Sequence, residues 1–461
     1  MEINLQKVIE IVHGVPSAGR TDRLIRSVVI DSRRAEQGSL FVAFLGEHVD
    51  GHDYLADCAR RGAVAALVQR EVDAPPGLVA IRVGDTQVAL QQLAAWYRRQ
   101  FPQLHVVGIT GSSGKTTTKE MVAAVLARKH PLLKTQGNFN NEIGLPLTMF
   151  DIRHEQRWAV LELGMAAEGE ISQLARICQP NIGVITNIGE AHMLHLGSKE
   201  AIMEAKFELA ENLVPPAWLI INGDDPWQRR RVEAGLPEVG RIISYGCSER
   251  NDFRAENISL DVSGSSFDVL WQGNSTPVRL NLPARHNISN ALAAFAVGTL
   301  LGIAPEEIAA ALGQVQGEKR RLQSFTLGGC TIIDDSYNAN PDSTIAALEL
   351  LSTYPWEQRK VAFVGDMLEL GSIAPEKHRL VGSAAVGHGV KLLIAVGQYA
   401  KDIQSGAVAA GMDVQAVLTY PDSKAATEAV TLLQPGDVVL IKGSLGVEMD
   451  TIVQFVKNGG F

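Results

Sequence analysis

Gly108-Ile-Thr-Gly-Ser-Ser-Gly-Lys-Thr-Thr117 is the stretch that decides the fold of this chain. It follows the run His105-Val-Val and precedes a helix-like run at 118–126, so the pattern predicts a glycine-rich turn between a strand and a helix. Such a turn points backbone N–H groups at an anion, while Lys115 offers a charge to a phosphate and Thr116 a hydroxyl to Mg²⁺. Ile109 stands six residues before Lys115, where the usual phosphate-loop pattern has glycine. A nucleoside triphosphate site is favoured over an ordinary glycine-rich turn with an incidental lysine.

The composition is that of a globular protein, with 46% hydrophobic and 20% charged residues among 461 and a net charge of −9. The negative charge argues against a general affinity for nucleic acid or anionic membranes. Four scattered cysteines without a CxxC pair indicate reduced thiols, not a disulfide framework or a zinc site. The N-terminus lacks a signal-peptide pattern, and the longest apolar stretch, 291–304, is shorter than the ~20 residues of a membrane span. We expect a cytoplasmic protein without membrane insertion.

The first of three blocks, residues 1–101, has the pattern of a small α/β domain. Its β-like runs lie at 27–30, 39–44, 65–68 and 78–83, and its helical segments at 54–61 and 86–99. Pro102 precedes the phosphate-loop strand and marks the expected boundary.

The second block, residues 102–315, repeats a pattern of apolar strands that end in glycine or polar residues. These strands are expected at 105–109, 158–163, 182–187 and 218–222. Nearly continuous apolar strands separated by helices predict a parallel sheet covered on both faces, with ligands beyond the carboxyl ends of the strands. Alternating runs at 258–262 and 267–271 predict an antiparallel hairpin around 263–266.

The third block, residues 316–461, has the pattern of a doubly wound α/β domain. Strands are expected at 361–364, 392–396 and 438–441, each followed by polar turn residues and separated by helical patterns. No GxGxxG fingerprint follows its first strand, which argues against dinucleotide binding.

Three side chains outside the phosphate loop are candidates for metal binding. Glu162 interrupts an apolar strand, and because burial of an unpaired carboxylate is costly, it needs a partner such as a metal. The alternative is a glutamate that bridges two helices. His192 follows the strand at 182–187 and is either a second metal ligand or a structural histidine. Lys206 lies in a helical run, and its pattern alone indicates a solvated lysine.

Two asparagine-rich segments are candidates for substrate contacts. The segment 135–144, which contains Asn140 and Asn141, suits a loop that hydrogen-bonds a polar substrate, or an Asx-rich turn. Asn287 is either the N-cap of the alanine-rich helix that follows, or it or Asn290 contacts a nucleotide base.

Two adjacent arginines lie upstream of a strand that ends in two carboxylates, Asp334 and Asp335. An arginine close to a transferring phosphoryl group stabilises the charge of the transition state, although paired surface arginines are common. Arg320 and Arg321 are the candidates for this role.

These motifs resemble those of the Mur ligases, the ATP-dependent amide-forming enzymes of peptidoglycan synthesis, over essentially the whole chain. The shared motifs are Thr110-Gly-Ser-Ser-Gly-Lys-Thr-Thr117, Gly137-Asn-Phe-Asn-Asn-Glu-Ile-Gly-Leu-Pro146, Asn187-Ile-Gly-Glu-Ala-His192, Ala205-Lys-Phe-Glu208, His286-Asn-Ile-Ser-Asn290, Asp334-Asp-Ser-Tyr-Asn-Ala-Asn-Pro341, Gly365-Asp-Met-Leu-Glu-Leu-Gly371 and Lys442-Gly-Ser444. The offset glycine of the phosphate loop is this family's own form, which accounts for Ile109.

The resemblance implies an α/β fold of three domains. The N-terminal one, which carries Asp31-Ser-Arg33 and Asp50-Gly-His-Asp53, is a small α/β domain for a uridine nucleotide. The central one is a P-loop ATPase-like parallel sheet with a small antiparallel β element. The C-terminal one is a Rossmann-like, doubly wound domain.

The resemblance also implies a role for each candidate residue. Thr116 and Glu162 would hold one Mg²⁺, and His192 and Lys206 a second, with Lys206 carbamylated by CO₂ so that it offers oxygen ligands. Ser32 and Arg33 would bind the uridine end of the substrate, with Asn140 and Asn141 along it. The residues implied for ATP are Thr110, Gly111, Ser112, Ser113, Gly114, Lys115, Thr116, Thr117, Asn287, Asn290, Arg321 and Asp335. Those implied for catalysis are Lys115, Lys206, His192, Arg321 and Asp335; Arg321 is preferred to Arg320 because it directly precedes Leu322.

The implied reaction joins D-Ala-D-Ala to UDP-N-acetylmuramoyl-tripeptide through an acyl phosphate, in a monomer. One alternative is the preceding ligase of the pathway, which adds the third amino acid and usually carries an Asp-Asn-Pro-Arg signature that this sequence lacks. A non-catalytic nucleotide-dependent switch leaves Glu162, His192 and Lys206 unexplained. A folate-type polyglutamate ligase would lack the uridine-domain motifs.

Overall fold

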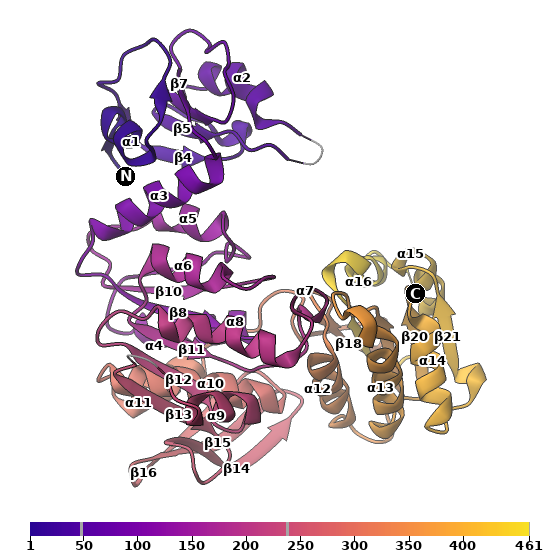
Figure 1. Cartoon of the computed structure of the whole chain (residues 1–461). Helices are drawn as coiled ribbons and strands as arrows, with labels where there is room; N and C mark the ends of the chain where they lie inside the picture. The colour runs from indigo at the N-terminus through magenta and orange to yellow at the C-terminus, as the bar shows by residue number, and fades with distance from the viewer. Residues whose placement is uncertain (47–48, 237–238, 461) are drawn as a thin grey trace.

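The computed structural model describes residues 1–46, 49–236 and 239–460, which form three α/β units in chain order (Figure 1). The units correspond to three main sheets, and the C-terminal unit lies beside the central one near α7. The α/β fold with three units is as the sequence predicted. The boundaries after residues 101 and 315 stay predictions. No helix within these described ranges combines the length and apolarity needed to cross a membrane.

The N-terminal unit has a sheet of strand order β2-β7-β6-β5-β4, parallel except for the β2–β7 pair. Its strands are β2 (Val15–Pro16), β4 (Ser27–Val29), β5 (Ser39–Val42), β6 (Ala65–Val68) and β7 (Val79–Arg82), with a separate pair β1 (Ile3–Asn4) and β3 (Leu24–Ile25). Its helices are α1 (Leu5–Val12), α2 (Leu55–Arg60) and α3 (Thr86–Arg99). Asp85 caps α3 by accepting from the backbone N–H groups of Gln87 and Val88, which fixes the helix start at the predicted residue.

The central unit has a nine-stranded sheet of order β16-β15-β14-β13-β12-β11-β8-β10-β9. Neighbouring strands are parallel from β9 to β14, and only the β14–β15 and β15–β16 pairs are antiparallel. The strands are β8 (His105–Thr110), β9 (Leu132–Lys134), β10 (Trp158–Glu162), β11 (Ile182–Ile185), β12 (Trp218–Asn222), β13 (Arg241–Gly246), β14 (Phe253–Asp261), β15 (Gly264–Trp271) and β16 (Asn274–Leu280).

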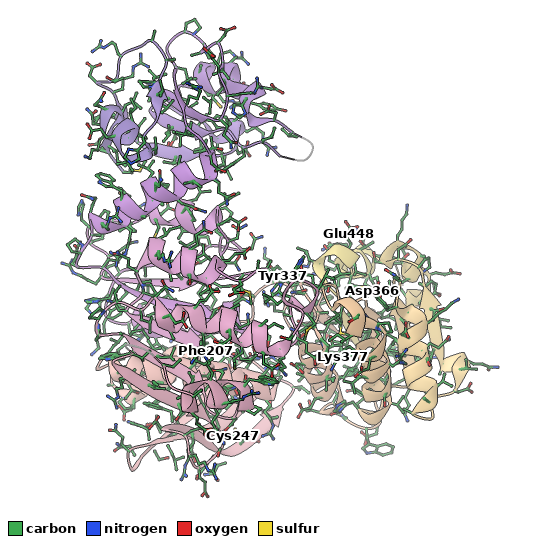
Figure 2. The ribbon with its side chains drawn as sticks, viewed as in Figure 1. Phe207, Cys247, Tyr337, Asp366, Lys377 and Glu448 are labelled. Carbon is green, nitrogen blue, oxygen red and sulfur yellow. The ribbon has the colours of Figure 1, made fainter. Side chains whose placement is uncertain are left out.

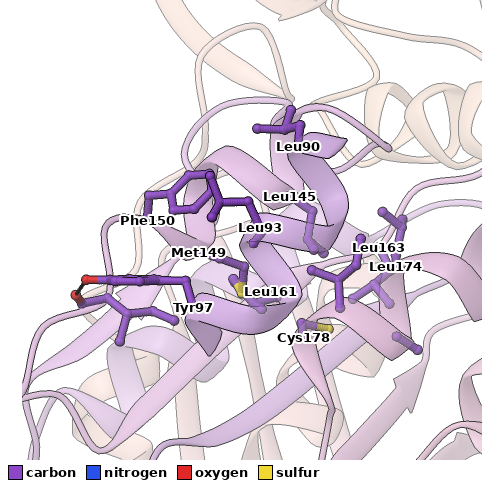
Figure 3. Packing of buried hydrophobic residues seen from close by; sticks show 14 of the residues in the cluster. Leu90, Leu93, Tyr97, Leu145, Met149, Phe150, Leu161, Leu163, Leu174 and Cys178 are labelled. Atoms are coloured by element: carbon purple, nitrogen blue, oxygen red, sulfur yellow. Dashed lines mark hydrogen bonds between the residues drawn. The ribbon is translucent and has the colours of Figure 1, made fainter. Parts of the chain in front are cut away.

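Helices cover both faces of this sheet, as the apolar strands predicted. They are α4 (Lys115–Leu126), α5 (Gly144–Met149), α6 (Glu170–Cys178), α7 (Met193–Leu196), α8 (Lys199–Glu211), α9 (Pro226–Glu233), α10 (Arg285–Leu300) and α11 (Pro305–Leu312). One apolar cluster lies under α4, α10 and α11, and another under α5, α6 and α8. The second cluster also takes in α3, as Figure 3 shows for Leu93 and Tyr97 beside Leu145 and Met149. The N-terminal and central units therefore share a core.

The predicted hairpin turn at 263–266 is wrong in its position. The turn is formed by Val262 and Ser263, and Gly264 already pairs with Asp261 at the start of β15. The Asp261 carboxylate accepts hydrogen bonds from the Ser263 N–H at 2.7 Å and from its hydroxyl at 2.5 Å, which closes a two-residue turn. A third strand, β16, joins the hairpin and was missed.

The C-terminal unit has a six-stranded sheet of order β17-β18-β22-β19-β20-β21, parallel except for the β17–β18 pair. The strands are β17 (Gln323–Leu327), β18 (Cys330–Asp335), β19 (Lys360–Gly365), β20 (Leu392–Val396), β21 (Val417–Tyr420) and β22 (Val438–Lys442). The helices are α12 (Pro341–Ser352), α13 (Ala374–Gly387), α14 (Ala400–Ala409), α15 (Ser423–Ala426) and α16 (Asp450–Lys457). Apolar clusters on both faces make the sheet doubly wound, so its ligand edge lies at Asp335, Gly365 and Lys442.

Candidate active site

A cavity of about 680 Å³ lies where the carboxyl edges of the central and C-terminal sheets face each other. The central unit supplies the phosphate loop, the ends of β10 and β11 and the start of α10, and the C-terminal unit supplies the segment after β18 and Lys442. Most of the predicted ATP, metal and substrate residues line this cavity: Ser112, Ser113, Gly114, Lys115, Thr116, Thr117, Asn140, Asn141, Glu162, His192, Asn287, Asn290, Arg321 and Asp335. The cavity is large enough for a nucleotide.

The phosphate loop is held in shape by the end of β11. The Ser113 N–H donates to the Asn187 side chain at 2.8 Å, and the Thr186 hydroxyl donates to the Ser113 carbonyl at 2.6 Å. Gly111 and Gly114 both have positive φ angles, of 147° and 78°. A side chain at Gly114 would meet Asn290 Oδ1 at 2.5 Å, so glycine here lets α10 approach the loop.

Lys115 begins α4, and its ammonium donates to the Gly111 carbonyl at 2.7 Å. Burial lowers the pKa of this lysine, while the nearby Glu162 carboxylate raises it. Within the described residues, the buried Thr110 hydroxyl at the end of β8 has no hydrogen-bond partner. A cation and an unsatisfied hydroxyl close to a helix N-terminus suit a bound phosphate.

Glu162 has the partners that its burial requires. The residue is only 3% exposed. Its carboxylate accepts hydrogen bonds from the Thr116 hydroxyl at 3.0 Å and from the Asn140 amide at 2.8 Å. Arg321 of the C-terminal unit donates to the same Thr116 hydroxyl at 3.2 Å. A hydroxyl and a carboxylate side by side are hard oxygen donors, which Mg²⁺ prefers, so this pair fits the predicted ion.

Lys206 is buried, which the residue pattern did not predict. It lies in α8 with 1% exposure, not on a solvated face. Burial, with repulsion from Lys115 as the smaller cause, lowers the pKa of Lys206 well below its ordinary value. An amine kept neutral is nucleophilic and can react with CO₂, so this environment fits a carbamate. Within residues 1–46, 49–236 and 239–460, three or more His, Cys, Asp or Glu side chains nowhere come together in a group that could hold a metal ion.

His192 precedes α7 and has a positive φ of 65°. Its buried Nδ1 lies 2.6 Å from Glu369 Oε2 of the C-terminal unit, a close contact that lacks the geometry of a hydrogen bond. The His192 ring lowers the pKa of the Glu369 carboxyl. Glu369 belongs to the Gly365–Gly371 motif, but no signal in that motif predicted a contact with His192.

The interpretation of Asn287 as an N-cap is wrong. The helix α10 starts at Arg285 with Ala284 in the cap position, so Asn287 lies in the first turn. Its side chain donates to the Pro283 carbonyl at 2.6 Å and accepts from Asn290 at 3.2 Å. This pair crosses the start of α10 beside the phosphate loop.

The two adjacent arginines point to different places. Arg321 stacks over the Tyr337 ring at 4.2 Å and contacts Thr116, whereas Arg320 contacts Ser336 and Asp450. This separation is consistent with the choice of Arg321 as the residue near the phosphate loop.

Asp335 lines the cavity and forms a buried ion pair with Lys442, whose ammonium lies 2.6 Å from its carboxylate. The same carboxylate accepts from the Leu322 N–H at 3.2 Å. Lys442 was missed as a site residue, although its Lys-Gly-Ser motif was the available signal. His286 and Tyr337, which also line the cavity, were missed as well.

Ser32 and Arg33 lie away from this cavity, in a short 3₁₀ helix of the N-terminal unit, η1 (Ser32–Arg34). The Arg33 side chain is 82% exposed and pairs with Asp31 at 2.8 Å. The Asn141 side chain accepts from the Gly144 N–H at 2.9 Å at the start of α5. Thr110, Gly111 and Lys206 do not line the cavity.

Comparisons with known proteins agree over the whole chain. Three family models match: the Mur ligase family catalytic domain at residues 24–98, the Mur ligase middle domain at 109–298, and the Mur ligase glutamate ligase domain at 320–445. A protein of Bacillus subtilis (strain 168) named UDP-N-acetylmuramoyl-tripeptide–D-alanyl-D-alanine ligase is 36% identical over 454 residues, which are 98% of this chain and 97% of that protein.

Two solved structures are also similar. The crystal structure of MurF from Acinetobacter baumannii has a TM-score of 0.91 and 34% identity, with 99% of each chain covered. That of MurF ligase from Thermotoga maritima in complex with ADP has a TM-score of 0.82 and 28% identity, covering 94% of this chain and 98% of that one. The resemblance predicted from the motifs is confirmed. The chain belongs to the Mur ligase family of ATP-dependent ligases.

Proposed function

We propose that this ligase joins D-Ala-D-Ala to UDP-N-acetylmuramoyl-tripeptide, with ATP cleaved to ADP and phosphate, as a monomer in the cytoplasm. The observation that carries the proposal is the cavity between a phosphate loop and the carboxyl edge of a second sheet, because it can bring ATP and two further substrates together. The name of the Bacillus subtilis relative supports the same choice of substrates.

The reaction begins when the tripeptide carboxylate attacks the γ-phosphorus of ATP and ADP leaves. The resulting acyl phosphate is attacked by the amine of D-Ala-D-Ala, which gives a tetrahedral intermediate. Loss of phosphate and of the amine proton leaves an amide. Lys115 and the loop N–H groups would bind the phosphates, and Arg321 would stabilise the charge that develops on the transferred group.

Thr116 and Glu162 would hold one Mg²⁺, and His192 with a carbamate on Lys206 a second. Bound Mg²⁺ would neutralise the negative charge of the phosphates. The burial of Lys206 supports this assignment because a carbamate forms from a neutral amine, and an ammonium cannot bind a metal. The Asn287–Asn290 pair would face the adenine. Ser32 and Arg33 would bind the uridine end, and Asn140 and Asn141 would lie along the substrate.

The substrate assignment is tested by ATP- and Mg²⁺-dependent phosphate release with the UDP-linked tripeptide. We expect release with D-Ala-D-Ala and little with single amino acids as acceptors. Activity with a single amino acid but not with the dipeptide would refute the assignment and favour the ligase that adds the third residue. Phosphate release that needs no amine acceptor would favour a nucleotide-dependent switch.

The carbamate is tested by the Lys206→Ala variant. We expect this variant to lose turnover and short-chain carboxylic acids to restore part of it, because such an acid can place its oxygens in the space left by the side chain. The matched control is Lys401→Ala on the exposed face of α14, which should keep full activity. Full activity in Lys206→Ala would rule out the carbamate.

A further inference from the structure

The Gly365–Gly371 motif forms a rigid segment at the carboxyl end of β19, and the proposed function does not use it. The Asp366 carboxylate accepts from the Gln398 N–H at 2.7 Å and the Tyr399 N–H at 3.0 Å. The Met367 N–H donates to the buried His378 ring at 2.9 Å. Asp366 is labelled on the C-terminal unit in Figure 2. These bonds fix the segment before it reaches Glu369.

Glu369 contacts the central unit through both its side chain and its backbone. Its carboxylate lies 2.6 Å from His192 Nδ1, and its carbonyl accepts from the Leu194 N–H at 2.8 Å. Gly371 follows with a φ of 58°, and a side chain there would meet the Leu194 Cα at 3.3 Å. The φ angle and this tight contact together favour glycine at this position.

A second contact joins the C-terminal unit to the segment that carries His192. Lys377, at the start of α13, lies 2.7 Å from the Glu190 carboxylate, and both side chains are less than one-fifth exposed. Figure 2 labels Lys377 on the C-terminal unit. This pair can hold the units together without touching the His192 ring.

His192 and Glu369 share an uncommon backbone conformation, with φ angles of 65° and 63°. Such conformations cost about 1–3 kcal/mol each in residues other than glycine and persist where the surroundings fix them. The two strained residues are 177 positions apart in the chain and meet at one contact. The contact therefore joins two residues whose backbone conformations are held by their surroundings.

We propose that Glu369 is a positioning residue for His192. The buried Nδ1 has no other partner among the described residues, and a small rotation of the ring would let the carboxylate accept a hydrogen bond from Nδ1–H. This bond would fix the tautomer and the orientation of the ring, which leaves Nε2 for a metal. Because Glu369 comes from the C-terminal unit, the second metal site would be complete only when that unit docks on the central one. This inference rests on the proposed function, in which His192 is a metal ligand.

The test measures Mn²⁺ binding by electron paramagnetic resonance in the presence of ADP, on the full chain without an acceptor. We expect Glu369→Ala to weaken Mn²⁺ binding ~10–100-fold, the usual effect of removing a partner of a ligating histidine. Glu369→Gln should lose less, because its amide oxygen still accepts a hydrogen bond without charge. In a His192→Gln background, Glu369→Ala should cause no further loss, since it acts through the ring.

The matched control is Glu448→Gln, an exposed glutamate of the same unit that also has a positive φ, of 54°. Mn²⁺ binding in this control should equal that of the wild type. The Lys377→Met variant removes an ion pair between the two units without touching His192, so it distinguishes weaker docking of the units from loss of positioning. We expect it to weaken Mn²⁺ binding less than ~3-fold, as for an ordinary ion pair. Equal losses in Lys377→Met and Glu369→Ala, or no loss in Glu369→Ala, would overturn the proposal.

Nuclear magnetic resonance of ¹⁵N-labelled histidine provides a readout without metal. The His192 signals, identified by their loss in His192→Gln, should report a proton on Nδ1 in the wild type and a mixture of tautomers in Glu369→Ala. Unchanged signals would contradict the proposal. If His192→Gln leaves Mn²⁺ binding unchanged, the metal role in the proposed function fails instead. If the phosphate-release assay fails while these effects hold, the substrate assignment fails and the positioning role stands.

Discussion

Replacement of Gly111 by alanine should destabilise the phosphate loop through one atomic contact. The new Cβ would lie 1.8 Å from the Thr186 hydroxyl oxygen, about half of an ordinary separation of ~3.5 Å. Thr186 could avoid it only by turning its hydroxyl away from the Ser113 carbonyl, to which it donates at 2.6 Å. Gly111 also has a φ of 147°, which residues with a side chain rarely adopt.

The expected cost has two parts. Overpacking of a filled site costs about 1–3 kcal/mol, and an unfavourable backbone conformation adds about 1–3 kcal/mol. Gly111→Ala should therefore lower the local free energy of unfolding by about 2–6 kcal/mol. In a Thr186→Ala background the hydroxyl is absent. The Cβ of residue 186 lies 3.0 Å from the position of the new Cβ at residue 111, so most of the overpacking cost should disappear.

The assay is hydrogen exchange of the peptides that cover residues 105–126, because a chain with three units need not unfold in two states. Gly273→Ala is the control, since its φ is also positive, at 78°, and no atom lies within 4 Å of the new Cβ. Measured on the peptides that cover residues 264–280, it should show the backbone cost alone, about 1–2 kcal/mol. If Gly111→Ala costs no more than Gly273→Ala, or costs the same with and without the Thr186 hydroxyl, the reasoning from this contact is refuted.

Two further variants test buried cations. Burial lowers the pKa of Lys206, so between that pKa and the unfolded value of about 10.4 the unfolded chain binds more protons and the free energy of unfolding rises with pH. In carbonate-free buffer, Lys206→Met should raise local stability at neutral pH and flatten this slope, measured by hydrogen exchange of the peptides that cover α8. An unchanged slope would contradict the burial. Arg98 donates to three main-chain carbonyls at 2.8–2.9 Å, so Arg98→Met should cost at least about 3 kcal/mol, measured by hydrogen exchange of the peptides that cover α3. The exposed Arg99→Met should stay within about 0.5 kcal/mol, and a similar value for both would refute the role of these bonds.

Local signals in the sequence predicted much of the framework. The strands β6, β12 and β20 and the helix α3 have the predicted bounds, because an apolar run between turn residues or an aspartate before a helix acts over a few residues. The strands β1, β2, β3, β9, β13, β16, β17 and β21 were missed. Several of these strands are short or lie at the edges of their sheets. An edge strand needs fewer apolar residues, so its hydrophobic pattern in the sequence is weak.

The sequence by itself determined the phosphate loop, the order of the three α/β units and the family, because spacing along the chain carries these signals. Only the tertiary structure decided that Lys206 is buried, that Arg321 and not Arg320 contacts Thr116, and that Glu369 meets His192. The physical reason is the same in each case. The exposure and partners of a side chain depend on what packs against its element, and those residues come from distant parts of the chain.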